Sequence, residues 1–392
     1  MRAIELFAGA GGLGIGVSRA GFIPAAVVEW NRWCRDTLRE NRDRKVQPVS
    51  KWPAHIESDI RKVDFSPHEG RVELVSGGPP CQPFSLGGRH RGRLDSRDMW
   101  PEAVRVVREV KPKAFIFENV KGLTRESFAS YLAYIVHQLT YPELVLRAEE
   151  GWIDHLRRLE RHHTRQPSQR TGLTYNVVHR VLNAANFGVP QRRERVVFVG
   201  FRSDLGVEWS FPSETHGLDA LAKSQQTGEY WERHRVPRGQ RGSAFTRPIQ
   251  LSLTEGGKLP WRTVRDAIGD LPDPVREIRK SSLLSNHKFQ PGARPYPGHT
   301  GSPLDLPAKT LKAGVHGVPG GENMLVNVDG SVRYFTVRES ARLQTFPDDF
   351  VFHGAWSEAM RQLGNAVPVD LAQVIAQDVR RHLGRTQPRK PL

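Results

Sequence analysis

The sequence predicts an α/β fold in two lobes, and three observations support this. Short apolar runs typical of buried strands alternate with helical segments over residues 1–200. The alternation stops near residue 201, where Pro, Gly, Arg and Thr become frequent, and it returns at residue 333. A chain of 392 residues can bury a large core and divide into two lobes. We expect a large lobe from residues 1–200 and 333–383, a smaller irregular lobe from 201–332, and a basic tail at 384–392.

The composition favours a polyanionic partner and a reducing compartment. The formal net charge is +16, which favours nucleic acid, although charge alone leaves open a basic surface without such a partner. The two cysteines, Cys34 and Cys81, are too few for a disulfide framework or a four-cysteine zinc site. No apolar run approaches the ~20 residues of a membrane span, and the N-terminus lacks a signal-peptide pattern. We therefore expect a cytoplasmic protein without membrane contact.

The N-terminal segment predicts a strand, a glycine-rich turn and a helix. Arg2–Phe7 forms the strand, and a second strand, Ala25–Val28, ends at Glu29, whose carboxylate can accept hydrogen bonds from ribose hydroxyls. Glycines in the turn let a ligand approach the backbone at a helix N-terminus. They fit the spacing G-x-G-x-x-G: Gly9, Gly11 and Gly14. At this point NAD and a structural turn without a ligand both remain open.

A single cysteine follows the next strands. A third strand is expected to end near Ser58–Ile60, where Asp59 could reach an adenine amino group or act as a loop or cap acid. The apolar run Val72–Val75 then leads into GGPPCQPFS at 77–85. Two glycines permit a tight turn and three prolines stiffen it, which would hold the Cys81 thiol in a fixed pose. The alternative is a proline-rich loop with an incidental thiol.

A buried strand also brings a carboxylate toward this loop. After a helix over 96–110, the strand Ala114–Phe117 is followed directly by Glu118. Cys81 and Glu118 thus both follow strands, and ligand crevices of open parallel sheets lie outside those strand ends. A solvated loop acid is the alternative for Glu118.

Two arginines precede the last strand of the large lobe. A charged insert at 149–171 comes first, and we expect an exposed helix and loop there, without metal at His162 and His163. The strands Tyr175–Leu182 and Val196–Gly200 follow. Arg193 and Arg195 would share one face if the second strand starts early, where they could bind an anion or a base edge.

Regular structure returns near the C-terminus. Thr336 and Glu339 have capping-box spacing and predict a helix start. Residues 362–369 are expected to form a turn before a final amphipathic helix that packs on the large lobe. Its apolar side consists of Leu371, Val374, Ile375 and Val379.

Together these motifs resemble the DNA cytosine-5 methyltransferases, mostly bacterial modification enzymes. The resemblance covers residues 2–200 and 333–383. Its blocks stand in the family's usual order: FAGAGG (7–12), EW (29–30), DI (59–60), GGPPCQPFS (77–85), ENV (118–120), QRRER (191–195), RESARLQTFPD (338–348) and QLGNAVP (362–368). It implies a Rossmann-like S-adenosylmethionine-dependent methyltransferase sheet, with a smaller irregular target-recognition domain at 201–332.

The resemblance implies S-adenosyl-L-methionine as cofactor, with S-adenosyl-L-homocysteine as product, rather than NAD. Glu29 would hold the ribose hydroxyls, Trp30 would pack on the adenine, and Asp59 would contact its edge. Trp100 stands where the family commonly has a leucine, which puts the packing beside the cofactor in question. The implied cofactor residues are Phe7, Ala8, Gly9, Gly11, Gly12, Glu29, Trp30, Asp59, Ile60, Pro80, Asn365 and Val367.

The resemblance also implies catalysis by Cys81, Glu118, Arg193 and Arg195. Cytosine C5 is a poor nucleophile, and a thiolate that adds at C6 makes C5 enamine-like. Cys81 would add, Glu118 would supply an acid at N3, and Arg195 would contact the cytosine carbonyl, with Arg193 in support. The base must leave the duplex stack.

We expect double-stranded DNA as the partner of a monomeric enzyme without a metal. Residues 85–97 are the expected mobile loop, and its proposed DNA contacts are Ser85, Arg89, Arg91, Arg93 and Arg97. A cognate restriction endonuclease or other defence proteins could accompany the enzyme near the bacterial nucleoid. Two alternatives remain: the same chemistry on transfer RNA, and a catalytically silent DNA-binding regulator, which intact Cys81 and Glu118 argue against.

Overall fold

The computed structural model describes residues 1–80, 98–164, 172–241, 257–297, 300–313 and 321–385. The predictions for Cys81, Ser85, Arg89, Arg91, Arg93 and Arg97 therefore lie outside the described residues, as does most of the expected basic tail. Within these ranges no helix has the length and apolar character needed to cross a membrane. No group of three or more His, Cys, Asp or Glu side chains in the same ranges could hold a metal ion.

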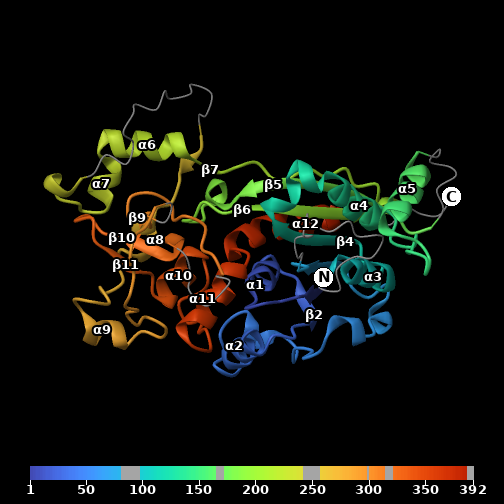
Figure 1. The fold of residues 1–392 in the computed structure, drawn as a ribbon, viewed down its shortest axis with the longest axis horizontal. Coiled ribbons are helices and arrows are strands. Elements are labelled where there is room, and N and C mark those ends of the chain that lie inside the picture. Colours follow the sequence, from blue (N-terminus) through green and yellow to red (C-terminus); the bar gives the residue numbers. More distant parts are fainter. Residues whose placement is uncertain (81–97, 165–171, 242–256, 298–299, 314–320, 386–392) are drawn as a thin grey trace.

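A six-stranded sheet lies at the centre of the large lobe (Figure 1). Its strands are β1 (Arg2–Leu6), β2 (Ile23–Val27), β3 (Leu74–Gly77), β4 (Ala114–Val120), β5 (Tyr175–Asn183) and β6 (Glu194–Arg202), in the order β2-β1-β3-β4-β6-β5. The first four strands are parallel, but β6 is antiparallel to β4 and β5. β6 is therefore the reversed strand of a mixed sheet, whereas β5 runs in the same direction as the first four strands. Residues 184–193 are too few for the crossover connection that parallel strands need.

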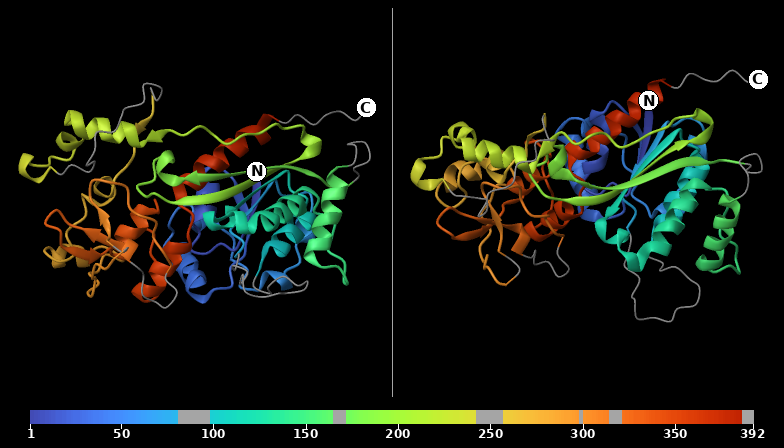
Figure 2. Two further views of the ribbon diagram at one scale, coloured as in Figure 1. Left: turned by 45° about the horizontal axis from the view of Figure 1, so that its top comes forward. Right: turned by 90° about the horizontal axis from the view of Figure 1, so that it is seen from above.

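Helices cover both faces of this sheet (Figure 2). On one face α1 (Gly12–Arg19) and α12 (Val369–Arg385) pack over Ile116 and Val197. On the other face α3 (Trp100–Val110) and α4 (Ala129–Thr140) pack over Phe117 and Phe198. The predicted C-terminal helix is therefore confirmed, and its buried side includes Leu371, Ile375 and Val379.

The charged insert adds α5 (Trp152–His163) on the outer side of α4. The expected exposed helix is confirmed for one side only, because His155, Leu156 and Leu159 are buried on the other. The His155 Nδ1 atom lies 2.8 Å from the Tyr134 hydroxyl of α4. The insert is thus an amphipathic helix docked on the large lobe.

A second, smaller lobe lies at the opposite end of the molecule from α5 (Figure 1). It contains short elements: β7 (His216–Gly217), α6 (Leu218–Thr227), α7 (Glu229–Arg233), β8 (Leu259–Pro260), α8 (Val264–Ile268), α9 (Ile278–Ser282), β9 (Ser302–Pro303), β10 (Met324–Val326) and β11 (Val332–Tyr334). Its core includes Leu311, Leu325 and Phe335. The Trp209 indole donates to Asp378 Oδ1 of α12 at 2.8 Å, so the chain before β7 still packs on the large lobe.

Several local predictions are corrected. No strand ends at Asp59, whose carboxylate instead caps a 3₁₀ turn, Ile60–Lys62, by accepting from the Arg61 N–H at 3.0 Å. Glu118 lies within β4 rather than after it. Gln362–Asn365 ends the helix α11 (Trp356–Asn365), so the expected turn is shorter. The predicted capping box of Thr336 and Glu339 is confirmed at the start of α10 (Val337–Leu343).

Candidate active site

Strand β3 delivers the chain to the segment that contains Cys81. The Met99 N–H donates to the Pro80 carbonyl at 3.1 Å, so the two ends of that segment lie side by side. The Asn119 side chain, on β4, donates to the Pro79 carbonyl at 2.9 Å. Sequence reasoning assigned Asn119 no role, although it stands in the ENV block. The fold therefore fixes the entry to the cysteine segment against β4.

Glu118 and Arg195 meet at the same place. Because β4 and β6 are antiparallel, with Val120 opposite Arg195, the two side chains share one face of the sheet. Arg195 Nε lies 2.7 Å from Glu118 Oε1, and both side chains are almost fully buried. A Cβ atom on Gly78 would lie 3.3 Å from Glu118 Oε2, so the carboxyl faces the backbone that leads to the cysteine segment.

Burial controls the protonation of this carboxyl. Loss of water raises the pKa of Glu118, and the nearby guanidinium groups of Arg195 and Arg193 oppose the rise. A carboxyl with a raised pKa holds its proton to a higher pH than an exposed carboxyl does, and it can donate that proton to a substrate. The pair thus combines a proton donor with a buried cation, which together can stabilise negative charge that develops on a base.

Arg193 occupies a different position from Arg195. Its side chain is completely buried, and burial lowers its pKa. Nη1 donates to the Leu311 carbonyl at 3.0 Å and Nη2 to the Gly364 carbonyl at 2.6 Å. These partners belong to the small lobe and to α11, so Arg193 links distant parts of the chain rather than facing a reacting group.

The glycine-rich turn adopts the conformation that a ligand site at this position needs. Phe7, Gly9 and Gly11 all have positive φ, at 53°, 56° and 91°. A Cβ atom on Gly9 would meet nothing within 4 Å, so this side of the turn is open. On Gly12 it would lie 2.3 Å from the Val367 carbonyl, so this glycine lets the C-terminal block approach α1. Ala8 is buried, and its N–H donates to the Val28 carbonyl at 3.1 Å.

Glu29 and Trp30 follow β2 at the same edge of the sheet. Glu29 accepts from the N–H groups of Gly9 and Asn31, each at 2.6 Å. Burial raises the pKa of Glu29, whereas these backbone donors and Arg35 lower it. Trp30 is 69% exposed, which is unusual for so large an aromatic side chain and suits stacking on a flat ligand.

The remaining predicted cofactor residues lie on three other segments. The Asp59 carboxylate pairs with Arg61, which lowers the pKa of Asp59. Ile60 is buried and Pro80 is exposed. Asn365 is exposed at the end of α11, two residues before the buried Val367. An open turn, a buried carboxylate and an exposed indole fit a ligand with a ribose and a flat base.

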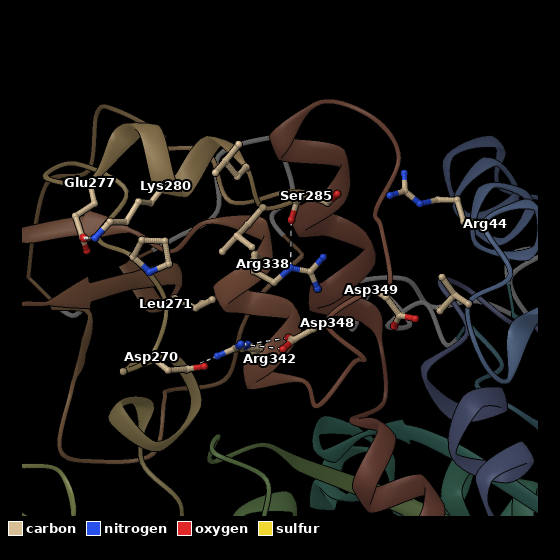
Figure 3. A pocket seen from close by; sticks show the side chains of 15 residues that line it. Arg44, Asp270, Leu271, Glu277, Lys280, Ser285, Arg338, Arg342, Asp348 and Asp349 are labelled. Atoms are coloured by element: carbon tan, nitrogen blue, oxygen red, sulfur yellow. Dashed lines mark hydrogen bonds and ion pairs between the residues drawn. The ribbon is translucent and has the colours of Figure 1, made fainter.

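A separate pocket of about 940 Å³ lies where the two lobes meet (Figure 3). It lies between α9, α10 and the end of α2 (Arg32–Asp43), and no predicted site residue lines it. Arg342 pairs there with Asp348 at 2.8 Å and with Asp270, and Arg338 donates to the Ser285 carbonyl at 3.2 Å. Its charges thus largely compensate one another.

Comparisons with known proteins identify the relatives of this chain. The family model for C-5 cytosine-specific DNA methylases matches residues 1–141 and 160–381, which omits most of the insert helix α5. Type II methyltransferase M.PspPI of Psychrobacter is 33% identical over 97% of this chain and 79% of its own length. M.Eco47II of Escherichia coli is 31% identical over 96% of this chain and 78% of its own length.

Two solved structures share the fold at low identity. One is a putative DNA modification methyltransferase encoded within an E. coli prophage, with a TM-score of 0.58 at 20% identity, covering 98% of this chain and 100% of that one. The other is the Dnmt2 methyltransferase of S. pombe, with a TM-score of 0.54 at 17% identity, covering 98% of each chain.

Proposed function

Because this chain belongs to the C-5 cytosine-specific DNA methylase family, we propose that it methylates C5 of a cytosine in duplex DNA with S-adenosyl-L-methionine as methyl donor. The observation that carries the proposal is the buried Glu118–Arg195 pair, which faces the start of the segment that contains Cys81. In this assignment the protein is a DNA (cytosine-5-)-methyltransferase, and each residue role below is part of the proposal.

Cys81 is the nucleophile. Its thiolate adds to C6 of the cytosine, which breaks the aromaticity of the ring and places electron density on N3 and the carbonyl oxygen. Glu118 delivers a proton to N3, and its raised pKa supports this role. The Arg195 guanidinium, which pairs with Glu118, stabilises the negative charge that develops on the cytosine carbonyl oxygen. Once C5 has taken the methyl group, water accepts the C5 proton, N3 returns its proton to Glu118, and the C6–S bond breaks to release the Cys81 thiolate.

The cofactor is held at the edge formed by the ends of β1 and β2. When bound, S-adenosyl-L-methionine supplies an electrophilic sulfonium methyl group. The Glu29 carboxylate accepts hydrogen bonds from the ribose hydroxyls through the lone pairs that the N–H groups of Gly9 and Asn31 leave free. Trp30 stacks on the adenine. The other contributors are the positions given above: Phe7, Ala8, Gly11, Gly12, Asp59, Ile60, Pro80, Asn365 and Val367.

The DNA lies between the two lobes. The small lobe reads the target word, and Ser85, Arg89, Arg91, Arg93 and Arg97 contact phosphates near the target base. The curated relatives M.PspPI and M.Eco47II are named type II methyltransferases. We further propose that the chain acts as a monomer in the bacterial cytoplasm, where it protects host DNA beside a cognate endonuclease or other defence proteins.

One experiment tests the proposal directly. The chain and its Cys81→Ala variant are expressed in a bacterial host that lacks cytosine methylation, and the DNA is sequenced for 5-methylcytosine at base resolution. We expect methylation at one short word with the native chain and none with the variant. Methylation absent from DNA but present in the RNA of the same cells would replace duplex DNA by RNA as the substrate.

A further inference from the structure

We infer that Arg193 is a positioning residue that transmits the placement of the small lobe to the Glu118–Arg195 pair. The inference rests on the proposed function, since the small lobe must be aligned with a cytosine that has left the DNA stack. Four features of the structure support it. The N–H and the carbonyl of Leu311 are both hydrogen-bonded to side chains of the QRRER block, and backbone hydrogen bonds continue from there toward Arg195. The Arg193 guanidinium also binds α11, and its buried charge acts on Glu118.

The peptide groups of Leu311 are held on both sides by one motif. The Gln191 Oε1 atom accepts from the Leu311 N–H at 3.1 Å, and Arg193 Nη1 donates to the Leu311 carbonyl at 3.0 Å. Both side chains are completely buried. Leu311 itself belongs to the core of the small lobe with Leu325 and Phe335. Two side chains of the QRRER block, Gln191 and Arg193, thus hydrogen-bond to the core of the small lobe.

The backbone continues this contact toward the catalytic pair. The Ala308 N–H donates to the Pro190 carbonyl at 2.9 Å, and the Arg192 N–H donates to the Ala308 carbonyl at 2.8 Å. The Thr310 hydroxyl donates to the Arg192 carbonyl at 2.7 Å. Residues 308–311 therefore lie along 190–193, and Arg195 follows two residues later in β6. A displacement of the small lobe is passed along this stretch to Arg195.

The Arg193 guanidinium also hydrogen-bonds to α11. Arg193 Nη2 donates to the Gly364 carbonyl at 2.6 Å. A Cβ atom on Gly364 would lie 2.3 Å from the Ala313 N atom, so the small-lobe segment passes directly against this glycine. A planar guanidinium presents its donors on separate nitrogens in a rigid fork, whereas a lysine presents three rotatable donors on one nitrogen. Arg193 thus holds 311 and 364 in one geometry.

Burying the charge of Arg193 costs free energy that an uncharged residue linking the same segments would not cost. Arg193 Nε has no hydrogen-bond partner within the described part of the chain, and no carboxylate there forms an ion pair with Arg193. Apolar residues of similar volume usually stabilise a buried site as well or better. The charge does act on the catalytic group, because it lowers the pKa of Glu118. Position and charge can therefore be separated by mutation.

Three variants make this separation. Arg193→Met removes both the hydrogen bonds to Leu311 and Gly364 and the charge, whereas Gln191→Leu releases the Leu311 N–H and the Leu343 carbonyl and leaves the charge in place. Arg265→Met is the matched control, because Arg265 pairs with Asp305 at 2.6 Å inside the small lobe. Single-turnover methylation of duplex DNA is measured per folded molecule, as a function of pH, with DNA affinity measured in parallel. Hydrogen exchange with and without duplex DNA follows residues 194–197 and 308–311.

We expect the rates of Arg193→Met and Gln191→Leu to fall roughly 10- to 100-fold at saturating DNA, because small misplacements at a reacting centre have effects of this size. DNA affinity should change by less than about threefold, since the contact is remote from the phosphates. Protonated Glu118 is the active form, so loss of the Arg193 charge should move the alkaline decline in rate to higher pH in that variant alone. Arg265→Met should keep both the rate and the pH profile.

Hydrogen exchange tests the inference even if the protein does not methylate DNA. In the native chain, protection of 308–311 by DNA should extend to 194–197, and in Arg193→Met it should stop at 311. A native chain that binds DNA but does not methylate it would sink the proposed function and leave the exchange result to decide on Arg193. Equal rates per folded molecule in Arg193→Met and the native chain, or unchanged protection of 194–197, would overturn the inference.

Discussion

At the scale of single residues, the proposed mechanism requires the Glu118 carboxyl to hold a proton beside a guanidinium only 2.7 Å away. Burial raises its pKa strongly enough to oppose the two nearby arginines. A group that is active when protonated loses activity as the pH rises through its pKa. We therefore expect the rate of methyl transfer to decline on the alkaline side of a raised pKa.

Glu118→Gln tests this assignment. The amide has nearly the same shape but no acidic proton, so we expect single-turnover methylation to fall roughly 10²- to 10⁴-fold, with the alkaline decline abolished. Cofactor affinity, measured by calorimetry, should stay unchanged, because Glu29 and Trp30 lie on another strand end. The matched control is Glu126→Gln, an exposed glutamate shortly after β4, which should keep the native rate.

Glu5 is a second buried carboxyl, and its effect should appear in stability. It lies in β1, accepts from the Ser76 hydroxyl of β3, and is 3% exposed. Burial raises its pKa to about 8 from 4.5. The folded protein therefore binds this proton more tightly than the unfolded chain, so the contribution is complete below about pH 4.5 and is lost as the pH rises to about 8.

Urea unfolding at low and high pH measures this loss. At 1.36 kcal/mol per pKa unit, the native chain should lose up to about 5 kcal/mol of unfolding free energy through Glu5 between pH 4.5 and pH 8. Glu5→Gln should flatten this slope, while Glu208→Gln at an exposed position should leave it as it is. A Glu5→Gln protein with the native slope would show that Glu5 is ionised in the folded state.

At the scale of elements, α1 and α12 cross at van der Waals contact because α1 carries glycine at the crossing. A Cβ atom on Gly16 would lie 2.5 Å from Ala372 Cβ and 2.6 Å from the Val369 carbonyl. Gly16→Ala must push the helices apart, so we expect it to destabilise the protein by about 1–3 kcal/mol. Gly384→Ala near the end of α12, where a Cβ meets nothing within 4 Å, should be neutral or slightly stabilising.

Thermal unfolding of both variants distinguishes crowding from helix propensity. Alanine is the better helix former at both positions, so propensity alone would stabilise both proteins. A lower melting temperature for Gly16→Ala alone identifies the helix crossing as the cause. Equal shifts in the two variants would mean that α12 can move away from α1 at little cost.

Elements with local signals could be predicted from the sequence. Thr336 and Glu339 satisfy each other within one turn, so their spacing is sufficient to predict the start of α10. The apparent strand near Asp59 was wrong because Ile56 forms only an isolated bridge with Val28, and Asp59 bonds to its own turn. The direction of β6 depends on its neighbours in the sheet, which no local pattern encodes.

The candidate site divides in the same way. The motif blocks placed Glu29 and Trp30 after β2, where the structure has them, whereas Glu118 and Arg195 lie inside β4 and β6, close to the strand ends. They gave no indication that Gln191 binds Leu311 or that Asn119 binds Pro79, because these partners are 120 and 40 residues away. Such contacts follow from how the lobes meet.

At the scale of the whole molecule, the two lobes are not independent units. Leu343 of α10, which belongs to the C-terminal block, packs in the small-lobe core with Phe335 and Leu311. Gln191 donates to the Leu343 carbonyl at 3.2 Å from the large lobe. The chain thus returns through the small lobe before it closes the large one, and both lobes share buried contacts near the Glu118–Arg195 pair.

Because the net charge is +16, the affinity for DNA should fall as the salt concentration rises. Each phosphate contact contributes a slope of about −0.9 to the logarithm of affinity against the logarithm of salt. If Arg89, Arg91 and Arg93 bind phosphates, replacing all three by alanine should reduce the slope by about 2–3 and weaken binding equally across DNA sequences.

The helix α5 and the segment before it offer a matched triple control. Arg157 and Arg161 are exposed on α5, and Arg147 is exposed five residues before it. The helix α5 lies at the opposite end of the molecule from the small lobe (Figure 1). DNA that lies between the lobes does not reach these arginines, so their replacement by alanine removes the same net charge with little change in slope. A slope that falls equally in both triple variants would mean that the DNA follows the general charge of the protein rather than the loop. A slope that falls only in the insert variant would place the DNA along α5.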